Sequence, residues 1–461
     1  MGADRDRDDG GGRDPGSIRL DSRALRARHP RGALGGARWW GAAVGSPALR
    51  GPPRPTARGG DPGASDGDED HRCLHRVVHR GRPDPRRLPH GGRPVTRAVI
   101  TGWGKCRPPL SLTNADLERL VETSDDWIAD RTGIVERGMC HMETTDMAEV
   151  AARHALAAAG LEPTDLDLII MCTLTPEVSC PSGACSLQER LGAVNAAAFD
   201  LNAACSGFVY GSVTAASMIA AGAKRTVLVV GVEKLHFLID YRDRNTCVLF
   251  GDGAGAAVYQ ASDDPDVPDA GAPGVLGTDL GADGVAGSTM VVPTLGSRGE
   301  LSSFRDPEHS RLHFEGQAVF KIAVRGMIDS VCRALDRAGL TADDVDLVVP
   351  HQANERIVRA AASRLGLTED QVMLNIATHG NTSAASIPMA LNDALDTARV
   401  RPGDIVVFTA FGGGVTWGSV VLRWGDRVER LGTSDAALGP VDMTVDELLA
   451  RNREFFAPLH D

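Results

Sequence analysis

The chain has 461 residues and a formal net charge of -12, a length that allows two or three domains and a large buried core. Its nine cysteines show neither C-x-x-C pairs nor His-spaced ligand sets, which disfavours a zinc site and a disulfide scaffold and predicts a reduced, cytoplasmic protein. No run approaches the roughly 18 apolar residues of a membrane span. The mixed charge after Met1 is unlike a secretion signal, so we expect no membrane partner.

The charge is unevenly distributed along the chain. Residues 1–94 hold 19 Arg, no Lys and 12 acidic residues, a balance of +7 that leaves -19 for the rest. This segment is rich in Gly, Pro, Arg and Asp and lacks apolar periodicity, so we expect a disordered tail or upstream sequence included by a misplaced start. A basic arm for an acidic partner is the less favoured alternative. The acidic remainder disfavours nucleic-acid binding.

Apolar strands alternate with Ala-rich helices in the rest of the chain. Residues 98–104 predict a strand, 113–121 a capped amphipathic helix, and 147–159 a second helix that leads into a strand at 166–171. The alternation is typical of a layered α/β fold. The Gly- and Ser-rich residues 271–303 predict connecting loops.

An internal repeat divides this folded part. Residues 159–170, AGLEPTDLDLII, return as AGLTADDVDLVV at 338–349. Two copies of one α/β unit are therefore predicted to pack together. We place the N-terminal half at 95–270 and the C-terminal half at 304–424, followed by a C-terminal extension at 425–461.

A cysteine lies at a predicted turn in the first copy. The apolar strand at 196–201 runs into small residues and then an Ala-rich helix from Gly207 to Ala221. This arrangement places Cys205 at a helix N-terminus, where the macrodipole should lower the pKa of the thiol below its usual value of about 8.5. Cys205 is thus a candidate nucleophile, although a free cysteine is more often inert packing.

Two polar residues in the second copy are candidate partners. His351 follows the repeated strand, at the edge where open α/β sheets bind ligands. Asn381 lies in a second small-residue turn of the corresponding region. Separately these are a loop histidine and a helix cap. Together they supply donors for a developing oxyanion or enolate.

Five segments resemble the signatures of the β-ketoacyl-acyl-carrier-protein synthase III family, condensing enzymes of the thiolase superfamily. The segments are 200–211, 250–257, 350–357, 379–388 and 411–418. The resemblance covers about residues 96–424. It implies an α/β, thiolase-like fold, with two duplicated halves in a five-layered α-β-α-β-α arrangement, and a homodimer.

The resemblance also implies roles for the candidate residues. Cys205, His351 and Asn381 match the catalytic set of the family. Cys205 would take an acyl group from acyl-CoA, with the backbone N–H groups of Cys205 and Gly413 as the oxyanion hole. Malonyl-acyl-carrier protein would then lose CO2, and His351 and Asn381 would stabilise the enolate that attacks the acyl-enzyme. No metal or other cofactor is implied.

Further positions are carried over from the family pattern. Acyl-CoA would be bound by Thr123, Trp127, Arg131, Arg244, Gly316 and Asn354. The acidic carrier protein would be bound by Lys321 and Arg356, with Arg364 a weaker candidate. The alternatives are a core aromatic residue for Trp127, which its polar neighbours disfavour, and ordinary solvated surface cations for the basic side chains.

The chain departs from the family pattern at two places. Cys180 stands where many relatives carry a phenylalanine that closes the partner subunit's primer pocket, so we expect a wider pocket. The extension at 425–461 continues past the family's usual end, and a capping box at Thr444 predicts a short helix that reaches Phe456.

Two other functions remain open. One is acyl transfer to an oxygen or nitrogen nucleophile without decarboxylation, which the retained Asn381 disfavours because such transfer forms no enolate. The other is a non-catalytic binding protein that acts through its basic head. The complete Cys-His-Asn set disfavours this second alternative.

Overall fold

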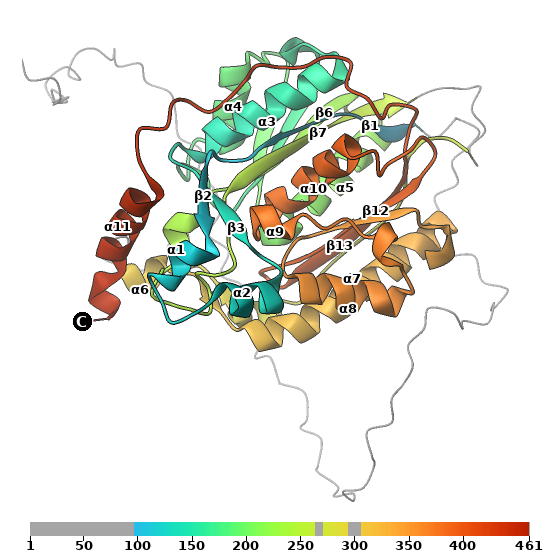
Figure 1. Ribbon diagram of the computed structural model, residues 1–461. Coiled ribbons are helices and arrows are strands. Elements are labelled where there is room, and N and C mark those ends of the chain that lie inside the picture. The colour runs from blue at the N-terminus through green and yellow to red at the C-terminus, as the bar shows by residue number, and fades with distance from the viewer. Residues whose placement is uncertain (1–95, 263–270, 294–305, 461) are drawn as a thin grey trace, which may run out of the picture. The chain divides into compact units, whose positions relative to one another are not determined.

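Two β-sheets run through the part of the chain that the computed structural model describes, residues 96–262, 271–293 and 306–460 (Figure 1). The tail predicted at 1–94 lies outside these described residues. The strand order of the first sheet is β1 (Arg97–Cys106), β7 (Gly253–Ser262), β6 (Thr226–Glu233), β4 (Leu168–Cys172) and β5 (Ala197–Leu201). In this sheet β4 is parallel to both of its neighbours, whereas β7 is antiparallel to both of its own.

The second sheet contains a strand that the sequence analysis missed. Its order is β11 (Leu347–Pro350), β12 (Ile405–Gly412), β13 (Thr416–Arg423) and β8 (Gly274–Ala282). β8 pairs antiparallel with β13 over its whole length. The prediction that 271–303 forms only connecting loops is therefore wrong for β8, which is the edge strand of this sheet.

Helices cover both faces of each sheet (Figure 1). The outer layer on the first sheet is α3 (Thr144–Ala159) and α4 (Gly183–Leu191). The layer between the sheets is α5 (Gly207–Ala220) and α10 (Ser386–Asp396), and the outer layer on the second sheet is α7 (Gly316–Ala338) and α8 (Glu355–Leu365). The predicted α-β-α-β-α order is confirmed.

The repeat predicted from the sequence corresponds to matching elements. α3 and α7 end at Gly160 and Gly339, whose φ angles of 67° and 72° lie in the left-handed region that favours glycine. Each glycine leads through a short 3-10 turn, Pro163–Asp165 or Ala342–Asp344, into a buried strand, β4 or β11. The repeated residues thus form a helix end, a turn and a core strand in both halves.

Smaller elements surround the two sheets. The helix predicted at 113–121 is shorter in the structure, where α1 (Asn114–Glu118) ends at Glu118, and Thr113 caps it as predicted. The remaining elements are α1 (Asn114–Glu118), α2 (Asp125–Thr132), α6 (Pro307–Ser310), α9 (Ile376–His379), β2 (Leu110–Thr113), β3 (Glu136–Met139), β9 (Met290–Val291) and β10 (His313–Phe314).

No helix among the described residues combines the length and the apolar character that crossing a membrane requires.

The C-terminal extension wraps around the first half. It crosses the outer side of α3, where the backbone N–H of Leu431 donates to the carbonyl of Ala158 (3.1 Å), and then reaches α11 (Val445–Phe456) at the far side (Figure 1). Thr444 and Glu447 form the predicted capping box. α11 packs through its buried leucines against the cluster that contains Leu235 and Tyr241.

Candidate active site

Two strained turns of the same design face each other at the centre of the molecule. Ala204 and Ser383 both have positive φ, 47° and 49°, which is rare for residues other than glycine. In each turn the strained residue donates its backbone N–H to the carboxamide oxygen of an asparagine two residues earlier. Ala204 donates to Asn202 (3.2 Å), and Ser383 donates to Asn381 (2.9 Å). Asn381 therefore corresponds in the repeat to Asn202, and Cys205 follows the strained residue of its own turn.

Cys205 lies at the N-terminal end of α5, as predicted, but its thiol is not activated in the predicted way. The residue is only 4% exposed, and a Cβ placed on Gly412 would come within 2.8 Å of the backbone nitrogen of Cys205. Gly413, in the same β12–β13 turn, packs beside Ala204. This close cover desolvates the sulfur and raises the pKa of the Cys205 thiol to about 12. The expected lowering of that pKa is wrong, because burial, together with the charge of Glu233, outweighs the hydrogen bonds that lower it.

His351 is a buried, neutral imidazole. It follows β11, and its backbone N–H donates to the carbonyl of Thr409 (2.8 Å). Its Nδ1 lies 2.7 Å from the Ser386 hydroxyl oxygen, which also accepts the backbone N–H of Gln352 (3.3 Å). The Ser386 proton can then point at Nδ1, which leaves the imidazole proton on Nε2. Burial lowers the pKa of His351 to about 3.

The turn at residues 381–386 brings the three predicted catalytic residues together. Ser386 contacts His351, and Ser383 hydrogen-bonds to the Cys205 thiol. Asn381 pairs with the end of the Leu249–Phe250 segment through its backbone, and its side-chain oxygen is occupied by the N–H of Ser383. The free side of the Asn381 carboxamide is therefore its NH2 group.

Glu233 is a site residue that sequence analysis missed. It ends β6 and is fully buried. One carboxylate oxygen accepts the Ser383 hydroxyl (3.1 Å), and the other accepts the hydroxyls of Thr175 (2.7 Å) and Thr173 (3.2 Å). Burial raises the pKa of Glu233 to about 7, against the opposing effect of these hydrogen bonds. A lone carboxylate at the end of an otherwise apolar strand is the signal that could have identified it.

Five of the six residues predicted to bind CoA lie on or beside α2. The Trp127 ring lies between two guanidinium groups, with the Arg131 carbon 4.6 Å and the Arg244 carbon 4.1 Å from its centroid. Asn354 caps α8, and its NH2 group donates to the Arg131 carbonyl (2.9 Å). The Thr123 hydroxyl is buried and has no partner among the described residues. A sixth predicted residue, Gly316, begins α7.

The predicted carrier-protein and primer residues lie at the surface. Lys321 on α7 and Arg364 on α8 are exposed. Arg356 is also exposed but is bound to Asp130 of α2 (2.6 Å), so its charge ties α8 to α2. Cys180 is exposed in the loop between β4 and α4. It is not among the residues that line the cavity described next.

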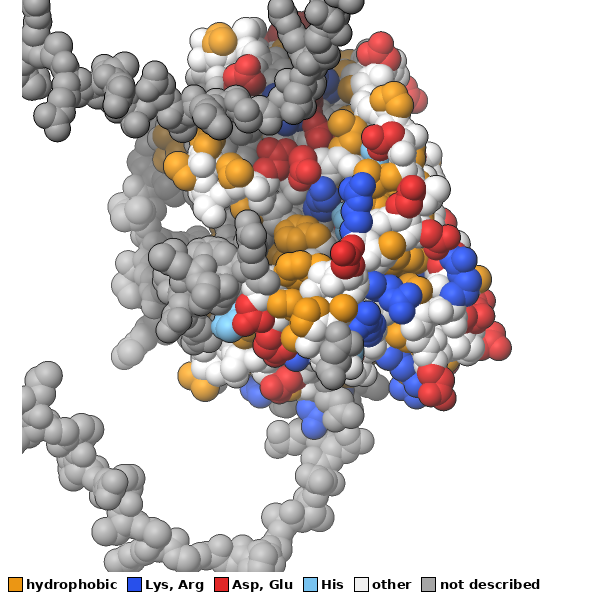
Figure 2. All heavy atoms as spheres, turned by 90° about the vertical axis from the view of Figure 1, so that its left-hand side faces the viewer, with side chains coloured by type: hydrophobic (Ala, Val, Ile, Leu, Met, Phe, Trp, Pro, Cys, Tyr) orange, Lys and Arg blue, Asp and Glu red, His pale blue; other side chains and the backbone are white. Residues whose placement is uncertain are grey.

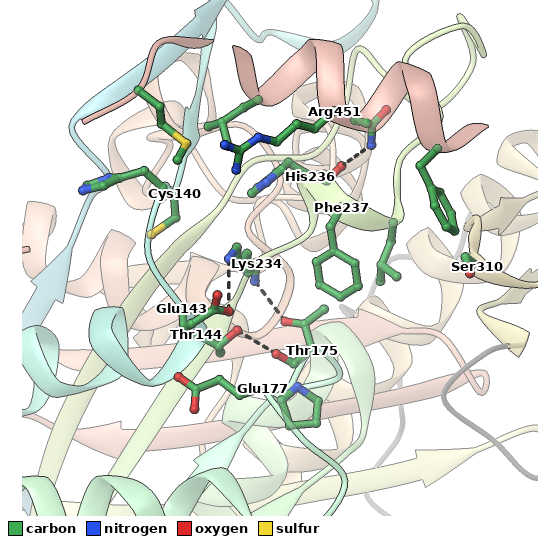
Figure 3. Close-up of a pocket in the computed structure, with 17 residues that line it drawn as sticks. Cys140, Glu143, Thr144, Thr175, Glu177, Lys234, His236, Phe237, Ser310 and Arg451 are labelled. Atoms are coloured by element: carbon green, nitrogen blue, oxygen red, sulfur yellow. Dashed lines mark hydrogen bonds and ion pairs between the residues drawn. The ribbon is translucent and has the colours of Figure 1, made fainter. Parts of the chain in front are cut away.

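A cavity of about 590 Å³ lies beside this site, between α11 and the loops that follow β4 and β6. Figure 3 shows Lys234 held between Glu143 and Thr175, and its Nζ lies 3.1 Å from the Glu143 carboxylate. Cys205, His351 and Asn381 do not line this cavity. Figure 2 shows apolar side chains gathered on the face that carries α11, where Phe237 and Phe455 are 40% and 39% exposed.

Comparisons with known proteins agree with this arrangement. Residues 199–284 match the family described as 3-oxoacyl-[acyl-carrier-protein (ACP)] synthase III, and residues 335–424 match its C-terminal domain. The β-ketoacyl-[acyl-carrier-protein] synthase III 2 of Vibrio cholerae is 43% identical over 354 residues, 77% of this chain and 96% of the relative. The β-ketoacyl-[acyl-carrier-protein] synthase III of Geobacillus kaustophilus is 48% identical over 71% of this chain and 99% of the relative.

Solved structures show the same likeness. The 3-oxoacyl-[acyl-carrier-protein] synthase III of Aquifex aeolicus has a TM-score of 0.65 and 44% identity, covering 71% of this chain and all of that one. The priming β-ketosynthase of the R1128 polyketide biosynthetic pathway has a TM-score of 0.66 and 34% identity, covering 73% of this chain and 99% of that one. The chain belongs to the β-ketoacyl-[acyl-carrier-protein] synthase III family of thiolase-like condensing enzymes.

Proposed function

We propose that the protein catalyses the decarboxylating condensation of an acyl-CoA primer with malonyl-acyl-carrier protein, to give a 3-oxoacyl-acyl-carrier protein that starts a fatty-acid or polyketide-type chain. The observation that carries this proposal is the turn at 381–386, which contacts both the Cys205 thiol and the His351 imidazole and presents the Asn381 carboxamide. The names of relatives that are more than 40% identical support the same reaction.

The first half-reaction is acyl transfer to Cys205. The sulfur attacks the thioester carbonyl, CoA leaves, and an acyl-enzyme remains. The backbone N–H groups of Cys205 and Gly413 are the proposed donors to the oxyanion. The close approach of the Gly412 backbone to the Cys205 turn supports this pairing.

The second half-reaction needs two hydrogen-bond donors near the acyl-enzyme. A neutral His351 with its proton on Nε2 is a donor, and so is the NH2 group of Asn381, because its oxygen is already engaged. Both would stabilise the enolate oxygen formed when malonyl-acyl-carrier protein loses CO2. The chemistry proposed for these residues requires no metal or redox cofactor.

The surface residues extend the proposal to the substrates. Trp127, Arg131, Arg244 and Thr123 would hold the adenine and phosphates of CoA, and their grouping around α2 supports this role. Gly316 and Asn354 would follow the pantetheine arm, and Lys321 and Arg356 would meet the carrier protein.

We also propose that the protein is a homodimer. β5 is the edge strand of the first sheet and leaves Phe199 37% exposed. An exposed apolar edge strand is a surface that another strand readily covers, which supports pairing with a second copy.

The test is intact-mass analysis of the purified protein after incubation with a panel of acyl-CoAs, followed by malonyl-acyl-carrier protein and assays for CO2 and product. We expect one acyl group per chain, lost when the second substrate is added. Cys205→Ala should abolish the acyl adduct. Cys106→Ala is the matched control, because its thiol is equally buried and also has a pKa of about 12 but lies at no helix N-terminus.

Two outcomes would contradict the proposal. An acyl adduct of wild-type yield in Cys205→Ala would mean that another residue is the nucleophile. Acylation without CO2 release, followed by transfer to an alcohol or amine, would identify an acyltransferase that does not condense.

A further inference from the structure

We propose that the cavity of about 590 Å³ beside α11 binds a small amphipathic carboxylate. The carboxyl group of this ligand contacts His236 and Arg451, and its aliphatic chain packs against Phe237 and Phe455. The volume is typical of small-molecule sites, which span about 300–1,000 Å³. The site goes beyond the proposed condensation, because the three catalytic residues assigned above do not line this cavity.

The first observation is an unpartnered nitrogen on a buried histidine in the cavity wall. His236 is only 6% exposed, and its Nδ1 lies 2.5 Å from the carboxylate of Asp252. That carboxylate also accepts the backbone N–H groups of Cys140 (2.7 Å), Leu235 (2.7 Å) and His236 (3.0 Å), so it is an acceptor and Nδ1 carries a ring proton. Nε2 has no partner among the described residues, and its side chain lines the cavity.

A carboxyl group satisfies Nε2 of His236 in either charge state of the ring. Nε2 of an imidazolium donates to a carboxylate, whereas Nε2 of a neutral ring accepts from a carboxylic acid. Other donors, such as an alcohol, would suit only the neutral ring. The choice of an acid therefore depends on the charges around the histidine.

Arg451 supplies a cation at the same end of the cavity. Figure 3 shows Arg451 and His236 at the end beside α11, and the side chain of the next residue, Asn452, donates to the His236 carbonyl (3.0 Å). No ion pair joins Arg451 to a described residue. The acidic residue nearest along the helix, Glu447, uses its carboxylate to accept the backbone N–H of Thr444 (2.7 Å). A guanidinium without a counter-ion is a strong partner for a carboxylate.

The other charged side chains that line the cavity already have partners. Lys234 lies 3.1 Å from the carboxylate of Glu143, and Glu177 lies 3.7 Å from the guanidinium of Arg190. Figure 3 shows Glu143 and Glu177 at the end of the cavity away from α11. The charge of the lining that remains uncompensated is therefore positive and lies beside His236, which favours an anionic ligand.

Apolar side chains form the rest of the wall. Phe237 follows β6 and Phe455 belongs to α11, and these large side chains remain 40% and 39% exposed. Leu238, Leu448 and Met443 line the same cavity. An aliphatic chain would remove this apolar surface from water. One polar end and one apolar wall match a ligand with a carboxyl group and an aliphatic chain.

Calorimetric titration of the full chain with butyrate, hexanoate and octanoate tests the site. We expect saturable binding of one molecule per chain, tightening by about fourfold for each added methylene. Octan-1-ol and octylamine are the matched ligands, because they keep the eight-carbon chain and replace the carboxyl group. Each should bind at least about tenfold more weakly than octanoate.

Arg451→Gln should weaken octanoate binding at least about tenfold, because it removes the cation that faces the carboxylate. Arg453→Gln is the matched control, since it makes the same charge change on the same helix at a residue that does not line the cavity. Octanoate should raise the midpoint of thermal unfolding in the wild type and in Arg453→Gln, and much less in Arg451→Gln. Phe455→Ser should weaken the binding of octanoate more than that of butyrate, because it removes apolar contact with the chain.

An octanoate affinity of Arg451→Gln within twofold of the wild type would overturn the proposal, because the ligand would then bind elsewhere, for example in the primer pocket. Equal affinities for octanoate and octan-1-ol, or no saturable binding at millimolar octanoate, would also refute it. A dimer that dissociates in Phe455→Ser and binds no octanoate would assign the aromatic face to a second copy instead. A protein that binds octanoate at this site but forms no acyl-enzyme would retain the site and lose the proposed function.

Discussion

Burial keeps the His351 imidazole neutral. The pKa of this imidazole is about 3 in the folded protein, against about 6.5 in an unfolded chain. The stability that the neutral form contributes is therefore complete above pH 6.5 and is lost as the pH falls toward 3. At pH 4.5 the loss amounts to about 2–3 kcal/mol.

This linkage gives a prediction for acid stability. His351→Gln should show a drop in the free energy of unfolding between pH 7.5 and pH 4.5 that is smaller than in the wild type by about 2–3 kcal/mol, measured by urea denaturation. His309→Gln, which removes a surface imidazole that is 41% exposed, is the control. An equal drop in wild type and His351→Gln would mean that His351 is solvated or already charged.

The two half-reactions separate the role of the enolate donors from that of the nucleophile. His351→Ala and Asn381→Ala should still form the acyl-enzyme but condense at least about a hundredfold more slowly, the scale expected for losing an oxyanion donor. Single-turnover acylation and condensation, measured separately, check this. An equal loss in both steps would indicate that the two residues support the structure of the turn.

Motif spacing identified Cys205, His351 and Asn381 as candidates, but it did not reveal what surrounds them. The hydrogen bond from Ser383 to the buried Glu233 is seen only when the turn at 381–386 is placed against the end of β6. The predicted direction of the Cys205 pKa shift was wrong because desolvation depends on atoms at the end of β12 and in the turn that follows it, which are distant in the sequence. Local sequence indicates that Cys205 lies near a helix N-terminus, but it does not indicate how completely the folded chain shields the thiol from water.

At the scale of elements, α11 is an anchored part of the fold. Leu449 is 2% exposed and packs in the cluster around Leu235, and the side chain of Asn452 donates to the carbonyls of His236 (3.0 Å) and Ile239 (2.8 Å). The helix thus holds the chain segment that follows β6, and Glu233 is the last residue of that strand. Loss of α11 should loosen this segment.

Leu449→Ala should lower the free energy of unfolding by about 2–5 kcal/mol, the cost of a cavity in a packed core. Denaturant unfolding measures it, and Arg451→Ala, an exposed position on the same helix, should change stability by less than about 0.5 kcal/mol. A Leu449→Ala variant as stable as the wild type would show that α11 detaches in solution.

The elements that were predicted correctly carry strong local sequence signals for a helix, a turn or a strand. The sequence of β8 carries no such signal. The helix ends at Gly160 and Gly339 follow from positive φ, which few other residues tolerate. β8 carries glycines at Gly277 and Gly281 because α7 and the Trp417 ring come so close that a Cβ would lie 2.2 Å and 2.4 Å from their atoms. Glycine is a poor strand signal, so the contacts that require it also conceal the strand.

At the scale of the whole molecule, the repeat predicted that two α/β units pack together, whereas the five-layered order was implied by the family resemblance. Assembly beyond one chain does not follow from that reasoning. The exposed edge at β5 and the exposed Cys180 loop belong to the same half. We propose that in a homodimer the Cys180 loop of one subunit would reach the primer pocket of the other, as the family resemblance implies.

The last prediction tests this assembly through primer size. Cys180→Phe should suppress longer or branched acyl-CoAs selectively and spare acetyl-CoA, because an aromatic side chain adds volume where only an extended acyl chain lies. Missing methylenes change binding by only about 1–3 kcal/mol each, whereas overlap in a close-packed tunnel is penalised more sharply. The measurement is the ratio of kcat/KM for a six- to eight-carbon primer to that for acetyl-CoA.

Cys185→Phe is the matched control, because Cys185 is also exposed but lies on α4 rather than in the loop. Sedimentation of both variants and the wild type shows whether the assembly is retained. A fall in the ratio confined to a dimeric Cys180→Phe protein places the loop in the partner's pocket. A dimer with an unchanged ratio means that Cys180 lines no primer pocket, and the inference of a wide primer range then fails because the position of this residue was its only support.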